Sequence, residues 1–232
     1  MEKLKKKKKF WNLRNLDDGS GELTLYGEIS NETWYGDEVT PQMFKSDLDN
    51  LGDIDTLNIY INSPGGDVFA GQTIYSILKR HKADKNVYID GLAASIASVI
   101  AMAGNTIFMP KNAMMMIHNP WTVAAGNANE FRKLADDLDK IRESLISAYE
   151  DRTMLNREEI IEIMDKETWL TAKECEEYGL CDVVEEEKMI AACVDLSLLK
   201  AYKNTPKELI KNNDKDADDT KPEEVLKQKI LI

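Results

Sequence analysis

The chain has few of the residues that form metal sites and disulfides. Its 232 residues include 3 cysteines and 2 histidines, and Cys175, Cys181 and Cys193 show no CxxC spacing. An odd number of cysteines without that spacing indicates reduced structural thiols, because two histidines do not complete a zinc cluster with them. The sequence therefore predicts no metal site, and we expect no cofactor.

Long apolar runs are also absent. No apolar window reaches about 18 residues, the length that a membrane-spanning helix needs. The basic run Lys5–Lys9 leads directly into Phe10, Trp11 and polar residues, so it lacks the apolar core of a signal peptide. We expect a soluble, cytoplasmic protein with no membrane partner.

Basic residues are fewer than acidic ones. The chain carries 30 Lys and Arg against 42 Asp and Glu, a net charge of −12. A surface of this sign repels nucleic acid, so we expect no nucleic-acid partner. Apolar residues, by contrast, are plentiful. They make up 43% of the chain, which is enough to build a complete hydrophobic core at this length.

Composition divides the chain into three regions. Residues 1–20 are polar, basic and irregular, which predicts a mobile arm. Residues 21–200 carry periodic apolar residues, which predicts one domain. Residues 201–232 become rich in Lys, Asp, Glu and Asn from Thr205 onward, which predicts a disordered tail, although 225–232 could also form a short docking helix.

The periodic segments predict an α/β fold. The expected strands, read from alternating or continuous apolar runs, are 22–29, 56–62, 86–89, 106–109, 113–117 and 181–184. The expected helices, read from helical spacing and capping residues, are 40–51, 68–81, 128–149, 157–164 and 171–179. The order strand 56–62, helix 68–81, strand 86–89 is a βαβ unit, which requires a parallel strand pair.

Ser95 stands where the strand at 86–89 and a turn of small residues give way to an apolar helix. One interpretation is an ordinary helix N-cap. The other is a nucleophile, because the free N–H groups and the dipole of a helix N-terminus stabilise negative charge that develops there. Taken alone, the segment favours the cap.

Two further segments favour the nucleophile. The neighbouring parallel strand ends at Gly65 and Gly66, and sites in such sheets form beyond the carboxyl ends of the strands. We therefore expect the two loops to face one cleft, with the N–H groups of Gly66 and Ile96 as an oxyanion hole. His118 follows the strand at 113–117 and is the preferred general base.

Four ordered motifs resemble one family. They are YINSPGG at 60–66, GLAAS at 91–95, MMIHNP at 115–120 and WLTAKECEEYGLCD at 169–182. Their order and spacing resemble those of the Clp protease proteolytic subunits (ClpP), over about residues 21–185. The segments INSPGGDVFAG, DGLAASIAS and ETWLTA are most similar to those of the ClpP-related head maturation proteases of phages and prophages.

The resemblance implies a ClpP and crotonase-like spiral of αββ units with a protruding long helix, and a serine endopeptidase. It places Ser95 on the nucleophile, His118 on the general base, and the amides of Gly66 and Ile96 on the oxyanion hole. The family's aspartate in the third triad position is matched here by Glu167. Asp165 is the second choice for the acid.

The resemblance also implies polypeptide substrates and self-association into rings. Phage scaffold and capsid proteins are the expected substrates. The alternative is a housekeeping subunit that degrades unfolded proteins delivered by a Clp ATPase, although residues 1–15 do not match that family's axial loop. Rival interpretations are a crotonase-type acyl-CoA enzyme, which would share the fold, and a catalytically silent ring subunit.

Overall fold

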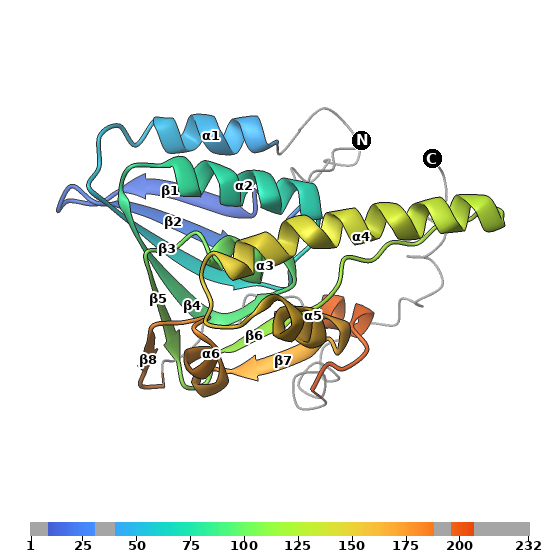
Figure 1. Ribbon diagram of the computed structural model, residues 1–232. Coiled ribbons are helices and arrows are strands. Elements are labelled where there is room, and N and C mark those ends of the chain that lie inside the picture. The colour runs from blue at the N-terminus through green and yellow to red at the C-terminus, as the bar shows by residue number, and fades with distance from the viewer. Residues whose placement is uncertain (1–8, 31–39, 188–195, 207–232) are drawn as a thin grey trace.

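The computed structural model describes residues 9–30, 40–187 and 196–206 (Figure 1). Within them the fold is mixed α/β, as predicted. The strands are β1 Trp11–Asn15, β2 Gly21–Tyr26, β3 Thr56–Ser63, β4 Asp84–Ala94, β5 Thr106–Pro110, β6 Met114–Ile117, β7 Thr168–Thr171 and β8 Val183–Glu185. The helices are α1 Pro41–Asp49, α2 Val68–Arg80, α3 Ile96–Ala101, α4 Ala128–Glu150, α5 Arg157–Asp165 and α6 Ala172–Tyr178, followed by the 3-10 helix η1 Leu196–Ala201.

The sheet runs in the order β1-β2-β3-β4-β5-β8 among the described residues, and β6 and β7 branch from β4. β3 pairs in parallel with both β2 and β4, which confirms the predicted βαβ unit. The core lies along these three strands, where Leu23, Ile59 and Val87 are fully buried. Burial alternates along β2, β3 and the first half of β4, and apolar residues alternate with it, which is why the sequence located these strands well.

β4 is longer than predicted and contains the small residues that were expected to form a turn. Its first half pairs with β3 and β5, and its second half, Leu92–Ala94, pairs in parallel with β6 at Met114–Met116. The prediction of a turn over these residues was wrong. Ala93 and Ala94 are fully buried, so their small size reflects close packing between strands rather than chain reversal.

The amino-terminal region holds the second correction. Residues 11–15 form β1, antiparallel to β2, so the prediction of irregular structure is wrong there. Trp11 is buried against Phe44 with ring centroids 5.6 Å apart, and its Nε1 donates to Asp47 at 2.9 Å. One aromatic anchor holds a strand whose other residues are mostly polar. Residues 1–8 lie outside the described part of the chain.

Two helices begin at the capping residues that the sequence predicted. Thr40 accepts a hydrogen bond from the Met43 N–H at the start of α1. Thr171 and Glu174 form the expected capping box of α6, which ends at Gly179 with a φ of 74°.

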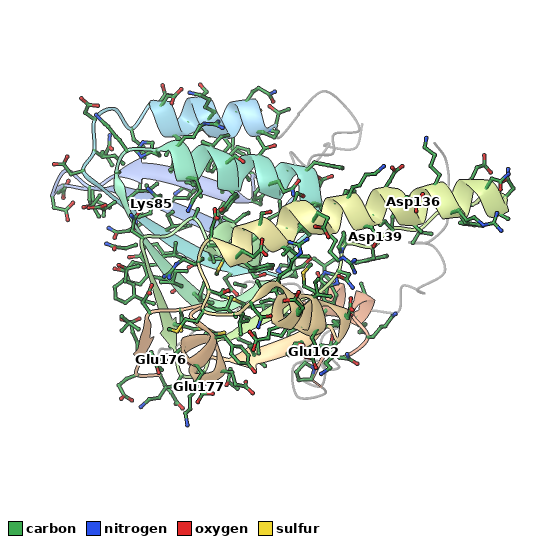
Figure 2. The ribbon with its side chains drawn as sticks, in the orientation of Figure 1. Lys85, Asp136, Asp139, Glu162, Glu176 and Glu177 are labelled. Atoms are coloured by element: carbon green, nitrogen blue, oxygen red, sulfur yellow. The ribbon has the colours of Figure 1, made fainter. Side chains whose placement is uncertain are left out.

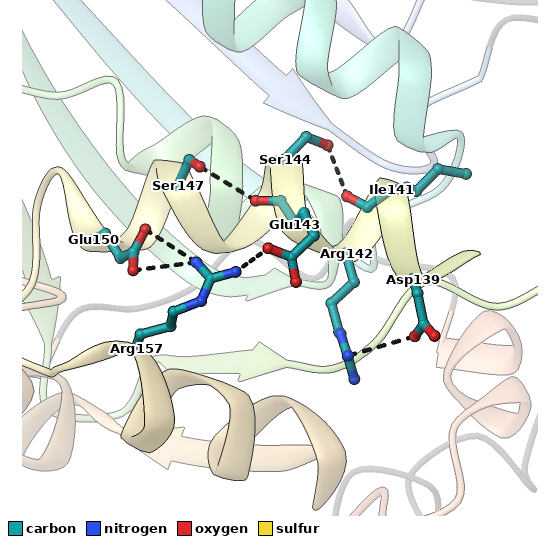
Figure 3. A network of polar contacts seen from close by, with 8 residues as sticks. All are labelled: Asp139, Ile141, Arg142, Glu143, Ser144, Ser147, Glu150 and Arg157. Atoms are coloured by element: carbon teal, nitrogen blue, oxygen red, sulfur yellow. Dashed lines mark hydrogen bonds and ion pairs between the residues drawn. The ribbon is translucent and has the colours of Figure 1, made fainter. Parts of the chain in front are cut away.

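α4 projects from the body of the molecule, which confirms the predicted protruding helix (Figure 1). Only residues near its carboxyl end are buried, and they include Ile146 and Tyr149. Figure 3 shows Arg157 of α5 between Glu143 and Glu150 of α4, pairing with both carboxylates. The base of the projection is therefore tied to the helix that leads into β7.

Acidic side chains cover the exterior, as the net charge requires. Figure 2 labels exposed carboxylates on three helices: Asp136, Asp139, Glu162, Glu176 and Glu177. Lys85 is the contrasting case, because it is buried and its Nζ donates to the carbonyls of His81 and Ala83. Across residues 9–30, 40–187 and 196–206, none of the helices has the length and apolar character that spanning a membrane requires.

Candidate active site

Ser95 lies between the end of β4 and the start of α3 in a backbone conformation that is rare for a serine. Its φ is 56° and its ψ is −128°. Such conformations cost about 1–3 kcal/mol and persist where the surrounding structure imposes them. Its side chain makes no capping hydrogen bond to α3. The interpretation of Ser95 as an ordinary N-cap is therefore wrong.

The Ser95 hydroxyl instead contacts His118. Ser95 Oγ lies 2.7 Å from His118 Nε2. β6 pairs in parallel with the second half of β4, and the Ser95 N–H donates to the Met116 carbonyl at 2.8 Å. Two adjacent strands thus deliver the serine and the histidine to the same edge of the sheet, as the sequence predicted.

His118 is held in its neutral form. Burial lowers its pKa from 6.5 to about 4, and the nearby Glu167 carboxylate offsets only part of that effect. A neutral imidazole with Nε2 facing a hydroxyl can accept its proton. At neutral pH this pair has the protonation state that general-base catalysis requires.

The Gly65–Gly66 loop borders the same hydroxyl. A Cβ placed on Gly65 would lie 2.7 Å from the Cβ of Ser95, so the two loops meet in one place as predicted. Gly66 has a φ of 146°, and a Cβ there would lie 1.9 Å from the Ile29 carbonyl oxygen. Only glycine fits this loop.

Two backbone donors are available beside Ser95. The Gly66 N–H makes no backbone hydrogen bond among the described residues. The Ile96 N–H is the first in α3, so it has no partner within the helix. Ile96 packs tightly on α2, where a Cβ on Gly71 would lie 2.2 Å from its Cγ1. The arrangement can stabilise an oxyanion formed at Ser95.

The two candidate acids lie in different surroundings. Glu167 has a positive φ of 48°, and among the described residues its carboxylate is the one that raises the pKa of His118. Asp165 is exposed, accepts from Asn119 Nδ2 at 2.7 Å and lies 3.6 Å from Arg142. Among the described residues no hydrogen bond joins either acid to His118. Glu167 Oε1 accepts from the Asn204 N–H at 2.6 Å.

Comparison with known proteins identifies the family. The family model for Clp protease matches residues 17–188, well over half of the chain. The chain belongs to the Clp protease family. Members are serine peptidases, so the chain is a peptide-bond hydrolase of the serine type. The Clp protease match covers β2 to β8 and all six α-helices, whereas β1 lies before it.

Two relatives show how similar the chain is to named Clp protease subunits. Both are called ATP-dependent Clp protease proteolytic subunit and come from Bacteroides fragilis, one from strain ATCC 25285 and one from strain YCH46. Each is 32% identical to this chain over 154 residues, 64% of its length. The matched part covers 74% of the first relative and 70% of the second.

Sequence reasoning missed two tyrosines near the site, Tyr149 and Tyr202. Ser98 Oγ donates to the Ser95 carbonyl at 2.6 Å and lies 2.8 Å from the hydroxyl of the buried Tyr149. Ser98 is thus structural, but it supports Ser95 directly. Tyr202 lies in the region predicted to be a disordered tail, yet its ring contacts His118 edge-on with centroids 5.1 Å apart. No local pattern links either tyrosine to the serine.

Proposed function

We propose that this serine peptidase cleaves polypeptides with Ser95 as nucleophile and His118 as general base. The observation that carries the proposal is the 2.7 Å contact between Ser95 Oγ and His118 Nε2. The conformation of Ser95 and the lowered pKa of His118 support it, since a capping serine needs neither.

The proposed reaction follows from this geometry. His118 Nε2 takes the hydroxyl proton as Ser95 Oγ attacks the peptide carbonyl carbon. The carbonyl oxygen becomes an oxyanion that accepts from the amides of Gly66 and Ile96. The protonated imidazole then gives the proton to the leaving amine, and water releases the acyl group by the same steps.

Glu167 is the proposed third member of the triad, with Asp165 as the second choice. The effect of the Glu167 carboxylate on the pKa of His118 supports this order, while Asp165 is engaged with Asn119 and Arg142. A carboxylate beside the imidazole stabilises the imidazolium that forms during proton transfer. Glutamate reaches farther than aspartate, which suits its position at the turn between α5 and β7.

The finer role we propose is maturation of phage heads, with scaffold or capsid proteins as substrates in the cytoplasm. Two sequence segments, INSPGGDVFAG at 61–71 and DGLAASIAS at 90–98, support this role because they resemble segments of phage head maturation proteases. The alternative is a housekeeping role beside a Clp ATPase, and the names of the two Bacteroides relatives favour it. Cleavage of a folded capsid precursor without ATP supports the first role, whereas strict dependence on a Clp ATPase supports the second.

We further propose that copies of the chain associate through α4. Most of this helix projects from the body, and Phe131 on it is 47% exposed. Trp121 and Val123, just before the helix, are 54% and 56% exposed. Apolar side chains gathered on a projection are typical of an association surface. Sedimentation of the purified chain tests this, and a monomer at high protein concentration would contradict it.

The catalytic proposal is tested by peptide cleavage in matched serine variants. Ser95→Ala is expected to abolish turnover of casein, whereas Ser46→Ala, on an exposed face of α1, keeps full activity. Ser98 is unsuitable as the control because it donates to the Ser95 carbonyl. Full activity in Ser95→Ala would remove Ser95 from the mechanism. Turnover of acyl-CoA esters without peptide cleavage would support the crotonase alternative.

A further inference from the structure

The described residues near the carboxyl end lie across the catalytic pair. Leu199 in η1 is fully buried in a small apolar cluster with Leu92, Ala94 and Met116, separate from the main core. Those three residues belong to β4 and β6, the strands that end at the serine and the histidine. The apolar surface beside the site is therefore covered by the chain itself.

Tyr202 covers the catalytic pair directly. Its hydroxyl donates to the Pro64 carbonyl at 2.6 Å. It borders the same spot as Ser95, because a Cβ placed on Gly65 would lie 3.2 Å from the Tyr202 hydroxyl and 2.7 Å from the Ser95 Cβ. Its ring meets His118 edge-on at 5.1 Å between centroids. Burial raises the pKa of Tyr202 to about 12, so the phenol stays neutral. The phenol therefore contacts both the loop before Gly65 and the ring of His118, which border the place that a substrate carbonyl must reach.

Asn204 engages the proposed acid. Its backbone N–H donates to Glu167 Oε1 at 2.6 Å, and its Nδ2 donates to the Lys166 carbonyl at 2.7 Å. The Glu167 carboxylate therefore accepts a hydrogen bond from Asn204, and among the described residues it makes none to His118. The same segment thus covers the nucleophile and occupies the acid.

We propose that residues 196–205 act as a built-in competitive inhibitor and that the chain described here is the latent form of the enzyme. The inference rests on the catalytic roles proposed above for Ser95, His118 and Glu167. The segment is not bound as a substrate, because a phenol hydroxyl faces Ser95 and offers no carbonyl carbon to attack. Activity requires that the segment leave the site.

The closed arrangement carries a cost that favours its release. Trp169, whose ring lies 6.2 Å from that of Tyr202, has its Nε1 buried with no hydrogen-bond partner among the described residues. A buried unsatisfied donor loses the hydrogen bond that water would supply. The Tyr202 side of the site therefore holds one unfavourable group beside the segment, and its lost hydrogen bond weighs against the closed arrangement.

The test measures the rate at which a fluorophosphonate labels Ser95 in the full chain. Tyr202→Ala is expected to label about tenfold faster, the change that follows from losing one hydrogen bond and a ring contact. Tyr202→Phe keeps the ring and is expected to fall between. Lys203→Ala, an exposed neighbour, is the matched control and labels at the wild-type rate.

Two further measurements separate the outcomes. A synthetic peptide of residues 196–206 is expected to slow labelling of Tyr202→Ala, and the same peptide with alanine in place of Tyr202 is not. Equal labelling rates in wild type and Tyr202→Ala, or no effect of the peptide, would overturn the inhibitor and leave the catalytic proposal intact. Labelling of Ser95 in no variant would overturn the catalytic roles, and the inhibitor with them.

Discussion

Lowering the pH is expected to destabilise the folded chain through His118. Burial lowers the pKa of this imidazole from 6.5 to about 4 in the folded state, whereas the unfolded chain takes up the proton near 6.5. Because the folded pKa is the lower one, the neutral imidazole contributes stability that is fully present above pH 6.5 and lost as the pH falls toward 4. We expect this group alone to lower the free energy of unfolding by about 3 kcal/mol across that window.

The assay compares wild type with His118→Gln by urea unfolding at several values between about pH 7.5 and about pH 4.5. Carboxylates and His81 titrate in both proteins, so the difference between the two isolates His118. The stability of wild type is expected to fall more steeply with decreasing pH. With 2 histidines in the chain, imidazole NMR signals also give the pKa directly, and the variant assigns them.

Two results would refute this reasoning. The first is an identical pH dependence of stability in wild type and His118→Gln. The second is an imidazole of His118 that titrates near 6.5, which would mean that it is hydrated rather than buried.

Four other substitutions have defined expected outcomes. Gly66→Ala is expected to lose at least about 2 kcal/mol of stability and nearly all peptidase activity, because the new Cβ meets the Ile29 carbonyl; thermal unfolding and casein turnover measure both. Tyr149→Phe is expected to lower the free energy of unfolding by about 1 kcal/mol through one buried hydrogen bond, and an unchanged melting temperature would contradict this. Glu167→Gln is expected to lower kcat at least about tenfold and Asp165→Asn to leave it nearly unchanged; the reverse order would make Asp165 the acid.

Where the sequence predicted the fold well, the information was local. Thr40 followed by Pro41, and Thr171 followed by Glu174, place backbone donors and acceptors within one turn of each other, so helix ends could be predicted from a few residues. The site followed from topology, because parallel strands bring Ser95 and His118 to one edge. The 2.7 Å contact between the Ser95 hydroxyl and His118 Nε2 agrees with that prediction.

What the sequence could not predict depends on contacts between distant segments. β1 exists because Trp11 packs on α1, and nothing in its polar neighbours indicates a strand. Gly91–Ala94 lacks the alternation that marks a half-buried strand, since this part of β4 pairs with β6. Tyr202 bonds to Pro64 across 138 positions, inside a region whose composition predicts disorder.

The central claim is that Ser95 attacks a carbonyl while the amides of Gly66 and Ile96 hold the oxyanion. The structure of the fluorophosphonate adduct tests it most directly. The account predicts phosphorus bonded to Ser95 Oγ, its free oxygen within about 3 Å of both amide nitrogens, and Tyr202 displaced from the pair. An adduct on another residue, or a phosphoryl oxygen that faces away from both amides, would contradict the account.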